Sequence, residues 1–326
     1  MKFCNSEKEL LIIRDKETDF SYGKKPEDRG ITEHINNGIV VIDKPENFTS
    51  HSVSEIVKKI LHLRKSGHTG TLDSNVTGVL PILLENSTKL SPIFKFLKRK
   101  YVGILRLHKD VSDNALREVF DHFTGKIYQM PPRKSAVKRV SRIREIYSLK
   151  FLEREGREIL FEVECESGTY IRKLCHDIGV FLGVNSNMQK LRRIQVGNFD
   201  ENSITTLHEL SDAYALYLQG NDKFLREIIL PFEKAVESFE KIWISDSTVN
   251  AICHGSSLYA PGVCKITKKI EKGKIVAIMS LKDELVAIAR AEMSSDEILN
   301  ANSGIVATPK RVVMKLGTYP KFLKEK

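Results

Sequence analysis

The sequence has few cysteines, and they follow no zinc-binding pattern. Its five cysteines include no CxxC pair, and their odd number argues against a disulfide framework, so a reducing compartment is expected. None of the nine histidines belongs to an HExxH pattern, and no Cys/His cluster has the spacing of a zinc site. We therefore expect no structural or catalytic metal, and no organic cofactor is implied either.

Long apolar runs are also missing. The N-terminal stretch MKFCNSEKELLIIRDKE lacks the apolar core of a signal peptide. Nowhere do about 18 apolar residues follow one another, which is the length that a membrane-spanning helix needs. The sequence thus predicts a cytoplasmic protein without a membrane association.

The composition is that of a globular protein with an excess of positive charge. Its 326 residues are most naturally divided into two domains, and 41% of them are hydrophobic against 29% charged. The 52 Lys and Arg outnumber the 42 Asp and Glu, leaving a net charge of +10. A polyanion such as nucleic acid is a reasonable partner, although lysine-rich surfaces also occur on proteins that bind none.

Three regions follow one another along the chain. Residues 1–36 are polar and include the turn-rich stretch SYGKKPEDRG, which indicates an irregular arm. Residues 37–236 form the expected main domain, and residues 237–326 alternate short apolar runs with Gly and Pro turns, as in a small β-barrel-like module. The region from Thr308 onward is strongly basic, and its basic residues are Lys310, Arg311, Lys315, Lys321, Lys324 and Lys326.

Within the main domain, periodicity predicts a buried strand in GIVVIDKP, stopped by Pro45, and a helix with a capping box at Ser52 and Glu55. The segment VGILRL predicts another strand. REILFEVECESG alternates as a strand does, and after Gly168 the apolar spacing becomes helical. Arg172 therefore lies just inside a helix that begins at a strand end.

The run GHTGTLD, from Gly67 to Asp73, places a carboxylate on a loop between ordered elements. Catalytic residues often occupy such loops, and an ionised aspartate can act as a covalent nucleophile. Taken alone, however, Asp73 is more typical of a turn residue. A second cluster, six basic residues between Arg133 and Arg144, is equally compatible with a solvated face and with a phosphate-binding surface.

Several motifs in a common order resolve this ambiguity. They are GHTGTLD followed by VTGVLP, the tripeptide DKP at 43–45, KRKY at 98–101, SGTYIRKL at 167–174 and MQKLRR at 188–193. Together they resemble the TruB type of pseudouridine synthase. The stretch YGKKPEDR and the C-terminal pattern are similar to the archaeal dyskerin-like branch, whose last domain is a PUA module. The chain has no long lysine-rich tails like those of eukaryotic members.

The resemblance implies an α+β fold, with a mixed, largely antiparallel sheet flanked by helices and a small C-terminal β-barrel-like PUA domain. It also implies conversion of uridine to pseudouridine in rRNA, directed by a guide, and in the TΨC loop of tRNA. The implied partners are tRNA, rRNA, box H/ACA guide RNA and the small H/ACA ribonucleoprotein subunits. Guided and stand-alone substrate choice both stay open.

By the same resemblance, Asp73 attacks the target nucleotide, Arg172 pairs with it, and Tyr101 stacks on the base and assists proton removal at C5. Attack at C1′, attack at C6 and a glycal route all remain open. A guanidinium suits the pairing role because it stays charged and grips a carboxylate with two donors. The remaining implied RNA contacts are His68, Leu191, Lys44, Lys310, Arg311 and Lys315.

One departure from the family pattern concerns the loop itself. Family members usually carry proline after the aspartate, whereas this chain has Ser74. Proline would stiffen the loop through its fixed φ, so its absence puts loop rigidity in question. Ser74 is also the one feature that favours an alternative function, an RNA-binding scaffold with a decayed catalytic site. A metal-dependent nuclease would need clustered carboxylates, and the sequence shows none.

Overall fold

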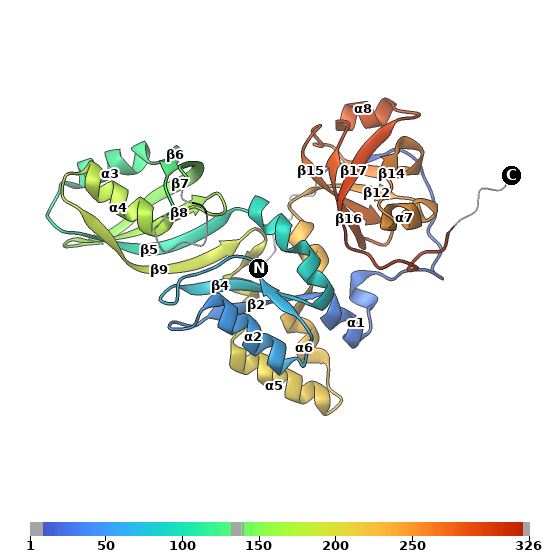
Figure 1. Ribbon diagram of the computed structural model, residues 1–326, viewed down its shortest axis with the longest axis horizontal. Coiled ribbons are helices and arrows are strands. Elements are labelled where there is room, and N and C mark those ends of the chain that lie inside the picture. The colour runs from blue at the N-terminus through green and yellow to red at the C-terminus, as the bar shows by residue number, and fades with distance from the viewer. Residues whose placement is uncertain (1–8, 132–137, 139, 322–326) are drawn as a thin grey trace. The chain divides into compact units, whose positions relative to one another are not determined.

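The computed structural model describes residues 9–131, 138 and 140–321, which form two compact units. One unit comprises residues 39–229. The other combines the described residues up to Gly38 with those from Leu230 onward. The N-terminal segment, expected to be an irregular arm, contributes strand β1 (Leu10–Ile12), which pairs antiparallel with β14 (Val263–Thr267) (Figure 1). Backbone pairing thus joins two segments about 250 residues apart in sequence.

The unit of residues 39–229 is built on one long sheet with helices packed against it. Its strands are β2 (Gly38–Lys44), β3 (Ser66–His68), β4 (Thr77–Leu84), β5 (Arg99–Leu107), β6 (Gly125–Gln129), β7 (Arg142–Glu155), β8 (Glu158–Cys165), β9 (Ser186–Val196) and β10 (Phe199–Asp200). Its α-helices are α2 (Ser50–Ile60), α3 (Asp113–His122), α4 (Ile171–Phe181), α5 (Leu207–Leu218) and α6 (Lys223–Ile228). Two 3₁₀ segments belong to it, η2 (Glu85–Phe96) and η3 (Glu201–Ser203).

The order of strands in this sheet is β2-β4-β9-β5-β8-β7-β6, with β11 (Ile229–Pro231) beside β2. Within β2-β4-β9-β5-β8-β7-β6, neighbouring strands pair antiparallel, except for β4 with β9, which are parallel. This parallel contact brings the strand that follows the GHTGTLD loop next to the strand of MQKLRR. The expected mixed, largely antiparallel sheet is therefore confirmed.

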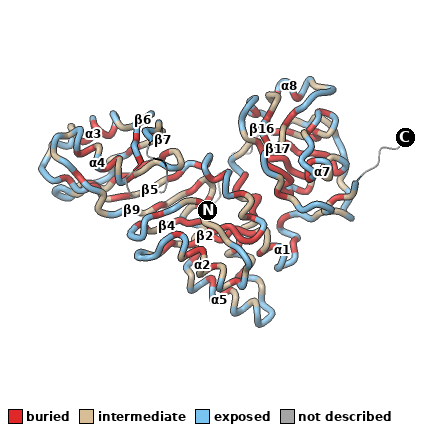
Figure 2. Tube along the Cα trace, in the orientation of Figure 1, coloured by how far each residue is buried: buried red, intermediate tan, exposed pale blue. Residues whose placement is uncertain are grey.

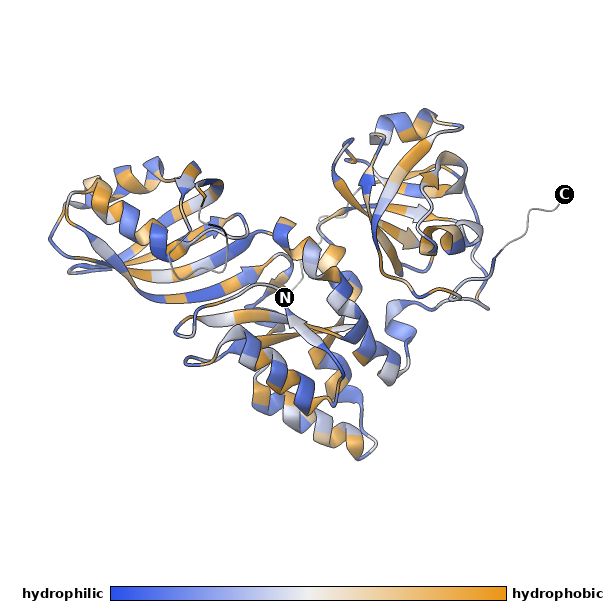
Figure 3. Cartoon of the chain, viewed as in Figure 1, coloured by the Kyte–Doolittle hydropathy of each residue, from blue (hydrophilic) through white to orange (hydrophobic). Residues whose placement is uncertain are grey.

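Amphipathic helices cover the sheet. Helices α3 and α4 lie over the β5–β9 part, and α2 and α5 lie against the β2–β4 part (Figure 1). Strand β8 alternates buried with half-buried positions, as expected for a strand with one face in the core, while β2 and β4 are buried almost throughout (Figure 2). On α2 and α4, apolar and polar residues occupy different faces of the helix (Figure 3).

The second unit contains the C-terminal sheet and the short N-terminal elements. Its strands are β1, β12 (Glu240–Ile244), β13 (Leu258–Tyr259), β14, β15 (Ile275–Ser280), β16 (Leu285–Ala291) and β17 (Ile305–Val312). Its helices are α1 (Ile31–Asn36), α7 (Asp246–Cys253), α8 (Ser295–Asn300) and the 3₁₀ segments η1 (Pro26–Asp28), η4 (Phe232–Val236) and η5 (Ala260–Gly262).

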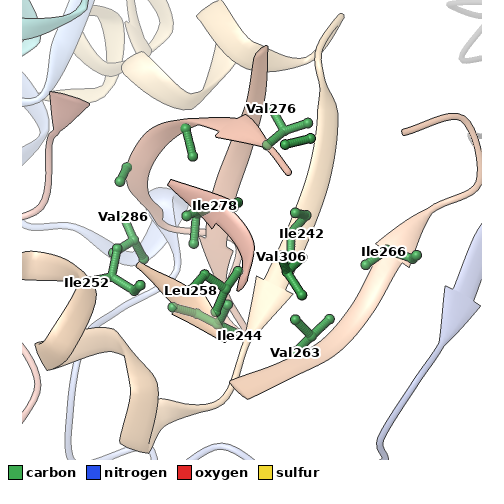
Figure 4. Close-up of a cluster of buried hydrophobic side chains, with 14 of the residues drawn as sticks. Ile242, Ile244, Ile252, Leu258, Val263, Ile266, Val276, Ile278, Val286 and Val306 are labelled. Carbon is green, nitrogen blue, oxygen red and sulfur yellow. The ribbon is translucent and has the colours of Figure 1, made fainter. Parts of the chain in front are cut away.

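The seven strands of this unit curl around a core of branched aliphatic side chains. The strand order is β1-β14-β12-β15-β16-β17-β13. Ile242, Val263, Ile278, Val286 and Val306 point toward one another from different strands (Figure 4), and each is fully buried. β-branched residues pack well on a pleated sheet, which explains why these short strands form a stable small domain. The expected β-rich C-terminal module is present.

Local expectations were mostly met, with one exception at a helix start. The strands predicted in GIVVIDKP, VGILRL and REILFEVECESG are β2, β5 and β8, and the helix after Gly168 is α4. The predicted capping box is wrong: α2 begins at Ser50, and the Thr49 side chain accepts the Ser52 amide at 3.0 Å. Thr and Ser are both favourable N-cap residues. The Ser-x-x-Glu spacing indicated Ser52, whereas the N-cap in the structure is Thr49.

Candidate active site

The GHTGTLD run leads from β3 into β4 and carries Asp73 on a turn. β3 ends at His68, and β4 begins at Thr77. The Val76 amide donates to the Asp73 carbonyl at 3.0 Å, which closes the turn. Asp73 is therefore held between two paired strands, with its side chain about half exposed.

The backbone of this loop is tied to the segment around the start of α2. The buried Ser50 hydroxyl accepts the Leu72 amide at 2.8 Å and donates to the Leu72 carbonyl at 3.3 Å. The Ser74 carbonyl accepts the Asn47 amide at 2.8 Å and the Lys44 ammonium at 3.1 Å. The residues on both sides of Asp73 are thus fixed by hydrogen bonds, and the loop is anchored without proline at position 74.

Two buried guanidiniums support the loop from inside. Arg99 donates to the Thr69 carbonyl at 3.0 Å, and Arg193 donates to the Val79 carbonyl at 2.8 Å and the Gly70 carbonyl at 3.5 Å. Arg193 is fully buried, and burial lowers its pKa to about 10, so it keeps its charge at neutral pH. Fully buried charged side chains are rare and costly in free energy, and they often occur at functional sites. The burial of Arg193 beside the GHTGTLD loop therefore indicates a functional site.

Asp73 and Arg172 form the predicted ion pair. An Arg172 guanidinium nitrogen lies 2.6 Å from a carboxylate oxygen of Asp73, across 99 residues of sequence. The two side chains are 57% and 53% exposed. An exposed pair contributes little to stability, about 0–1 kcal/mol, so its geometry must come from the elements that carry it. Arg172 is the second residue of α4.

Tyr101 and Leu191 lie on adjacent strands, β5 and β9, near one another. Tyr101 is paired with Arg193, and Gly103 with Leu191, in the same ladder. Both side chains are buried, and both belong to the cluster that also contains Leu72 from the loop. Because alternate residues of a strand share a face, Tyr101 and position 103 lie on the same face of the sheet. The structure thus brings these residues and the Asp73 loop into one region.

His68, in the GHTGTLD run, is partly enclosed, and Lys44 is fully enclosed. His68 is partly buried, burial lowers the pKa of its imidazole, and the charges of His51 and Arg193 lower it further. Its Nδ1 has no hydrogen-bond partner among the described residues. Lys44 is fully buried, and its ammonium donates to the Pro45 and Ser74 carbonyls. In this structure Lys44 supports the loop beside Asp73.

The basic residues predicted to bind RNA in the C-terminal module belong to the other unit. Lys310 and Arg311 are exposed on β17, and Lys315 is exposed just after it. Of the six basic residues from Arg133 to Arg144, three lie outside the described residues, namely Arg133, Lys134 and Arg139. Arg144 has a structural role there, since it donates to the Gly168 carbonyl and pairs with Glu166, each at 3.2 Å.

Sequence reasoning missed several supporting residues: Ser50, Gln129, Arg99 and Arg193. The side chains of all four form hydrogen bonds with backbone atoms. A backbone group can belong to any residue type, so such a contact produces no recognisable pattern of residues in the sequence. Arg99 and Arg193 did lie inside the KRKY and MQKLRR motifs, which was the only available hint.

In residues 9–131, 138 and 140–321, no group of three His, Cys, Asp or Glu side chains could hold a metal ion. The same part of the chain has no helix long and apolar enough to cross a membrane.

Comparison with known proteins covers nearly the whole chain. Models of the TruB family pseudouridylate synthase N-terminal domain and the tRNA pseudouridylate synthase B C-terminal domain match residues 58–171 and 172–237. DKCLD and PUA domain models match residues 4–54 and 240–313. A "Probable tRNA pseudouridine synthase B" of Methanosarcina barkeri is 49% identical over 97% of this chain and 94% of its own length. The chain belongs to the TruB family of pseudouridylate synthases.

Other members of the TruB family are similar in sequence and in structure. The protein of the same description from Methanocaldococcus jannaschii is 46% identical over 100% of this chain and 97% of its own. The solved structure "Crystal Structure of a Cbf5-Nop10-Gar1 Complex" matches with a TM-score of 0.91 and 44% identity, over 98% of both chains. "Structure of H/ACA RNP bound to a substrate RNA containing 2'-deoxyuridine" matches with a TM-score of 0.89 and 42% identity, over 97% of this chain and 98% of that one.

Proposed function

We propose that this protein converts uridine to pseudouridine in rRNA under the direction of a box H/ACA guide RNA, and in the TΨC loop of tRNA. The observation that carries the proposal is the 2.6 Å contact between Asp73 and Arg172, residues that come from two separate family motifs. Support for the substrates comes from relatives described as tRNA pseudouridine synthases and from a similar chain in an H/ACA particle bound to substrate RNA.

The partners follow from the same comparisons. Similar solved chains are found in complexes with Nop10 and Gar1. The similarity over 98% of both chains, with a TM-score of 0.91, supports the same partners here. We therefore propose that this protein assembles with guide RNA and small H/ACA subunits, with residues 37–236 as catalytic domain and residues 237–326 as PUA domain.

Asp73 supplies the nucleophile in the proposed reaction. The N1–C1′ bond of uridine breaks, the uracil turns while it stays bound, C5 bonds to C1′, the proton on C5 leaves, and N1 takes up a proton. A carboxylate at position 73 can add to the nucleotide and be released again, so no atom is gained or lost overall. Arg172 aims the carboxylate through the 2.6 Å contact between the two side chains.

Binding the target base requires its removal from the RNA stack. Extrusion of a base costs a few kcal/mol. The Tyr101 ring and the Leu191 side chain line the region beside the Asp73 loop, and stacking on an aromatic ring returns about 1–3 kcal/mol. Tyr101 also offers a hydroxyl for proton transfer at C5. His68, whose imidazole pKa is lowered by burial, contacts the displaced nucleotide in this proposal.

The anchored loop around Asp73 argues against the alternative of a decayed scaffold. That alternative rested on Ser74, and the loop around Ser74 is held by Asn47 and Lys44. Tritium release from RNA labelled at uridine C5 separates the two functions. We expect release by the protein assembled with guide RNA and small subunits, or with tRNA. RNA binding without release from either substrate would contradict the proposed activity.

Replacing Arg311 with Ala tests the role of the C-terminal module. Removing one phosphate contact should weaken RNA binding at low salt by about 3- to 10-fold and reduce the slope of log affinity against log salt by about one. The rate at saturating RNA should not change. Filter binding across a salt series measures the effect, with Arg157→Ala, an exposed arginine of the other unit, as control. An unchanged slope would remove Arg311 from the RNA interface.

A further inference from the structure

The position of Arg172 depends on a turn that has no capping side chain of its own. Helix α4 begins at Ile171, and its N-cap residue Tyr170 makes no side-chain capping hydrogen bond. The preceding Gly168 has φ +86°, a conformation that favours glycine. Because the first turn of a helix has free amides and frays easily, something else must hold this end. Arg172 is only one residue further along the helix.

The side chain of Gln129 holds that end. Its amide nitrogen donates to the Tyr170 carbonyl at 3.1 Å, and its amide oxygen accepts the Tyr170 amide at 2.9 Å. Gln129 is the last residue of β6 and is 2% exposed. One side-chain amide thus contacts both backbone groups of one residue, whose carbonyl also accepts the Leu174 amide at 3.0 Å inside the helix. Buried polar groups in such an arrangement are costly to leave unpaired, about 1–3 kcal/mol each.

Only an amide provides this pair of contacts at neutral pH. It presents one donor and one acceptor side by side, which matches the N–H and C=O of a single residue. An ionised carboxylate has acceptors alone and would repel the Tyr170 carbonyl. A methionine of similar length has neither group. The chemistry of the contact is therefore specific to glutamine, although the residue touches no group that reacts.

We propose that Gln129 is a positioning residue for the Asp73–Arg172 pair, which rests on the proposed function. The path is short: Gln129 fixes Tyr170, Tyr170 is the N-cap of α4, and α4 carries Arg172 within 2.6 Å of Asp73. The ion pair is exposed and weak, so it does not position itself. A displacement of about 1 Å at a catalytic group can reduce a rate by about 100-fold.

Arg144 supports the same turn from the next strand. It donates to the Gly168 carbonyl and pairs with Glu166, while the Glu166 amide donates to the Glu145 carbonyl at 2.8 Å. Strands β6 and β7 thus both form hydrogen bonds with the turn of residues 166–170. The Asp, Glu, Lys, Arg and His residues of β6, of the adjoining start of β7, of the turn and of the first two turns of α4 are Lys126, Arg142, Arg144, Glu145, Glu166, Arg172, Lys173, His176 and Asp177.

Two variants separate positioning from general stability. Gln129→Met removes both hydrogen bonds at any pH. Gln129→Glu restores both when its carboxyl is protonated, because the acid then has one donor and one acceptor, and loses one when it ionises. We expect single-turnover pseudouridine formation to fall by about 10- to 100-fold in Gln129→Met, with RNA affinity within about twofold of the parent.

The pH profile provides the decisive comparison. Relative to the parent, Gln129→Glu should be most active at acid pH and should lose activity as pH rises through the pKa of the new carboxyl. In an Arg172→Ala background, neither variant should reduce the rate further. Gln195→Glu, the same change at a glutamine of β9 that donates to the Gly197 carbonyl at 2.8 Å, serves as control and should keep the parent profile.

A crystal structure of Gln129→Glu at high pH gives a readout that needs no activity. The Arg172–Asp73 contact should be broken or displaced by more than about 1 Å. If it stays in place, or if the ratio of rates does not vary with pH, the proposal is wrong. If the parent protein itself forms no pseudouridine, the proposed function fails, while the structure still decides the positioning role. Should Gln129→Met not fold, the pH dependence of Gln129→Glu decides.

Discussion

Replacing Asp73 with Asn is expected to reduce pseudouridine formation by at least about 10⁴-fold, because an amide cannot replace a carboxylate nucleophile. The substitution keeps the size and shape of the side chain, which is about half exposed and outside the core. The backbone contacts around it, from Ser50 and Asn47, do not involve the side chain. RNA binding and thermal stability should therefore stay close to those of the parent.

The measurement is single-turnover conversion of a radiolabelled uridine, with product separated after digestion of the RNA. Asp110→Asn is a matched control, since Asp110 is an exposed carboxylate that pairs with Arg157 at 2.8 Å and lies outside the site. It should retain the parent rate. A parent-like rate in Asp73→Asn would end the assignment of Asp73 as the nucleophile. A loss of RNA binding in parallel with the rate would instead indicate a structural role.

Helices and strands whose apolar residues recur at a regular spacing could be predicted from the sequence. The alternation in β8 and the helical spacing in α4 reflect burial on one face, and that burial is what the structure shows. The meeting of Asp73 with Arg172 could be predicted only through the family resemblance, because no local pattern links residues 99 positions apart. The contact depends on the order of strands in the sheet, which local spacing does not encode.

Other features depend on tertiary contacts and escaped prediction. The N-terminal region is polar overall, yet Leu10–Ile12 form a strand because they pair with strand β14. Gln129 is an unremarkable polar residue in sequence, and its burial becomes visible only when the turn before α4 is in place. Lys44, inferred to contact RNA, is buried under the loop instead of lying on a surface. In each case the partner is backbone from a distant segment.

Replacing Gly70 with Ala is expected to disrupt the catalytic loop, because Arg99 fills the space beside this glycine. A methyl group at position 70 would lie 2.3 Å from one terminal nitrogen of the Arg99 guanidinium and 2.7 Å from the other. The backbone φ of Gly70, +154°, is also unfavourable for alanine. The buried guanidinium must move, and its hydrogen bond to the Thr69 carbonyl is then lost. We expect a loss of about 1–3 kcal/mol in stability.

The effect on catalysis should be larger than the effect on stability. Gly70 lies three residues before Asp73, and a shift of about 1 Å there would reduce the rate by about 100-fold. Gly67→Ala is the matched control from the same GHTGTLD run, because a methyl group there meets only Thr88, at 3.8 Å. It should change stability by less than about 0.5 kcal/mol and leave the rate unchanged. Thermal unfolding by circular dichroism and single-turnover rates measure both variants. Equal behaviour of Gly70→Ala and Gly67→Ala would show that the packing of Arg99 against the loop does not position Asp73.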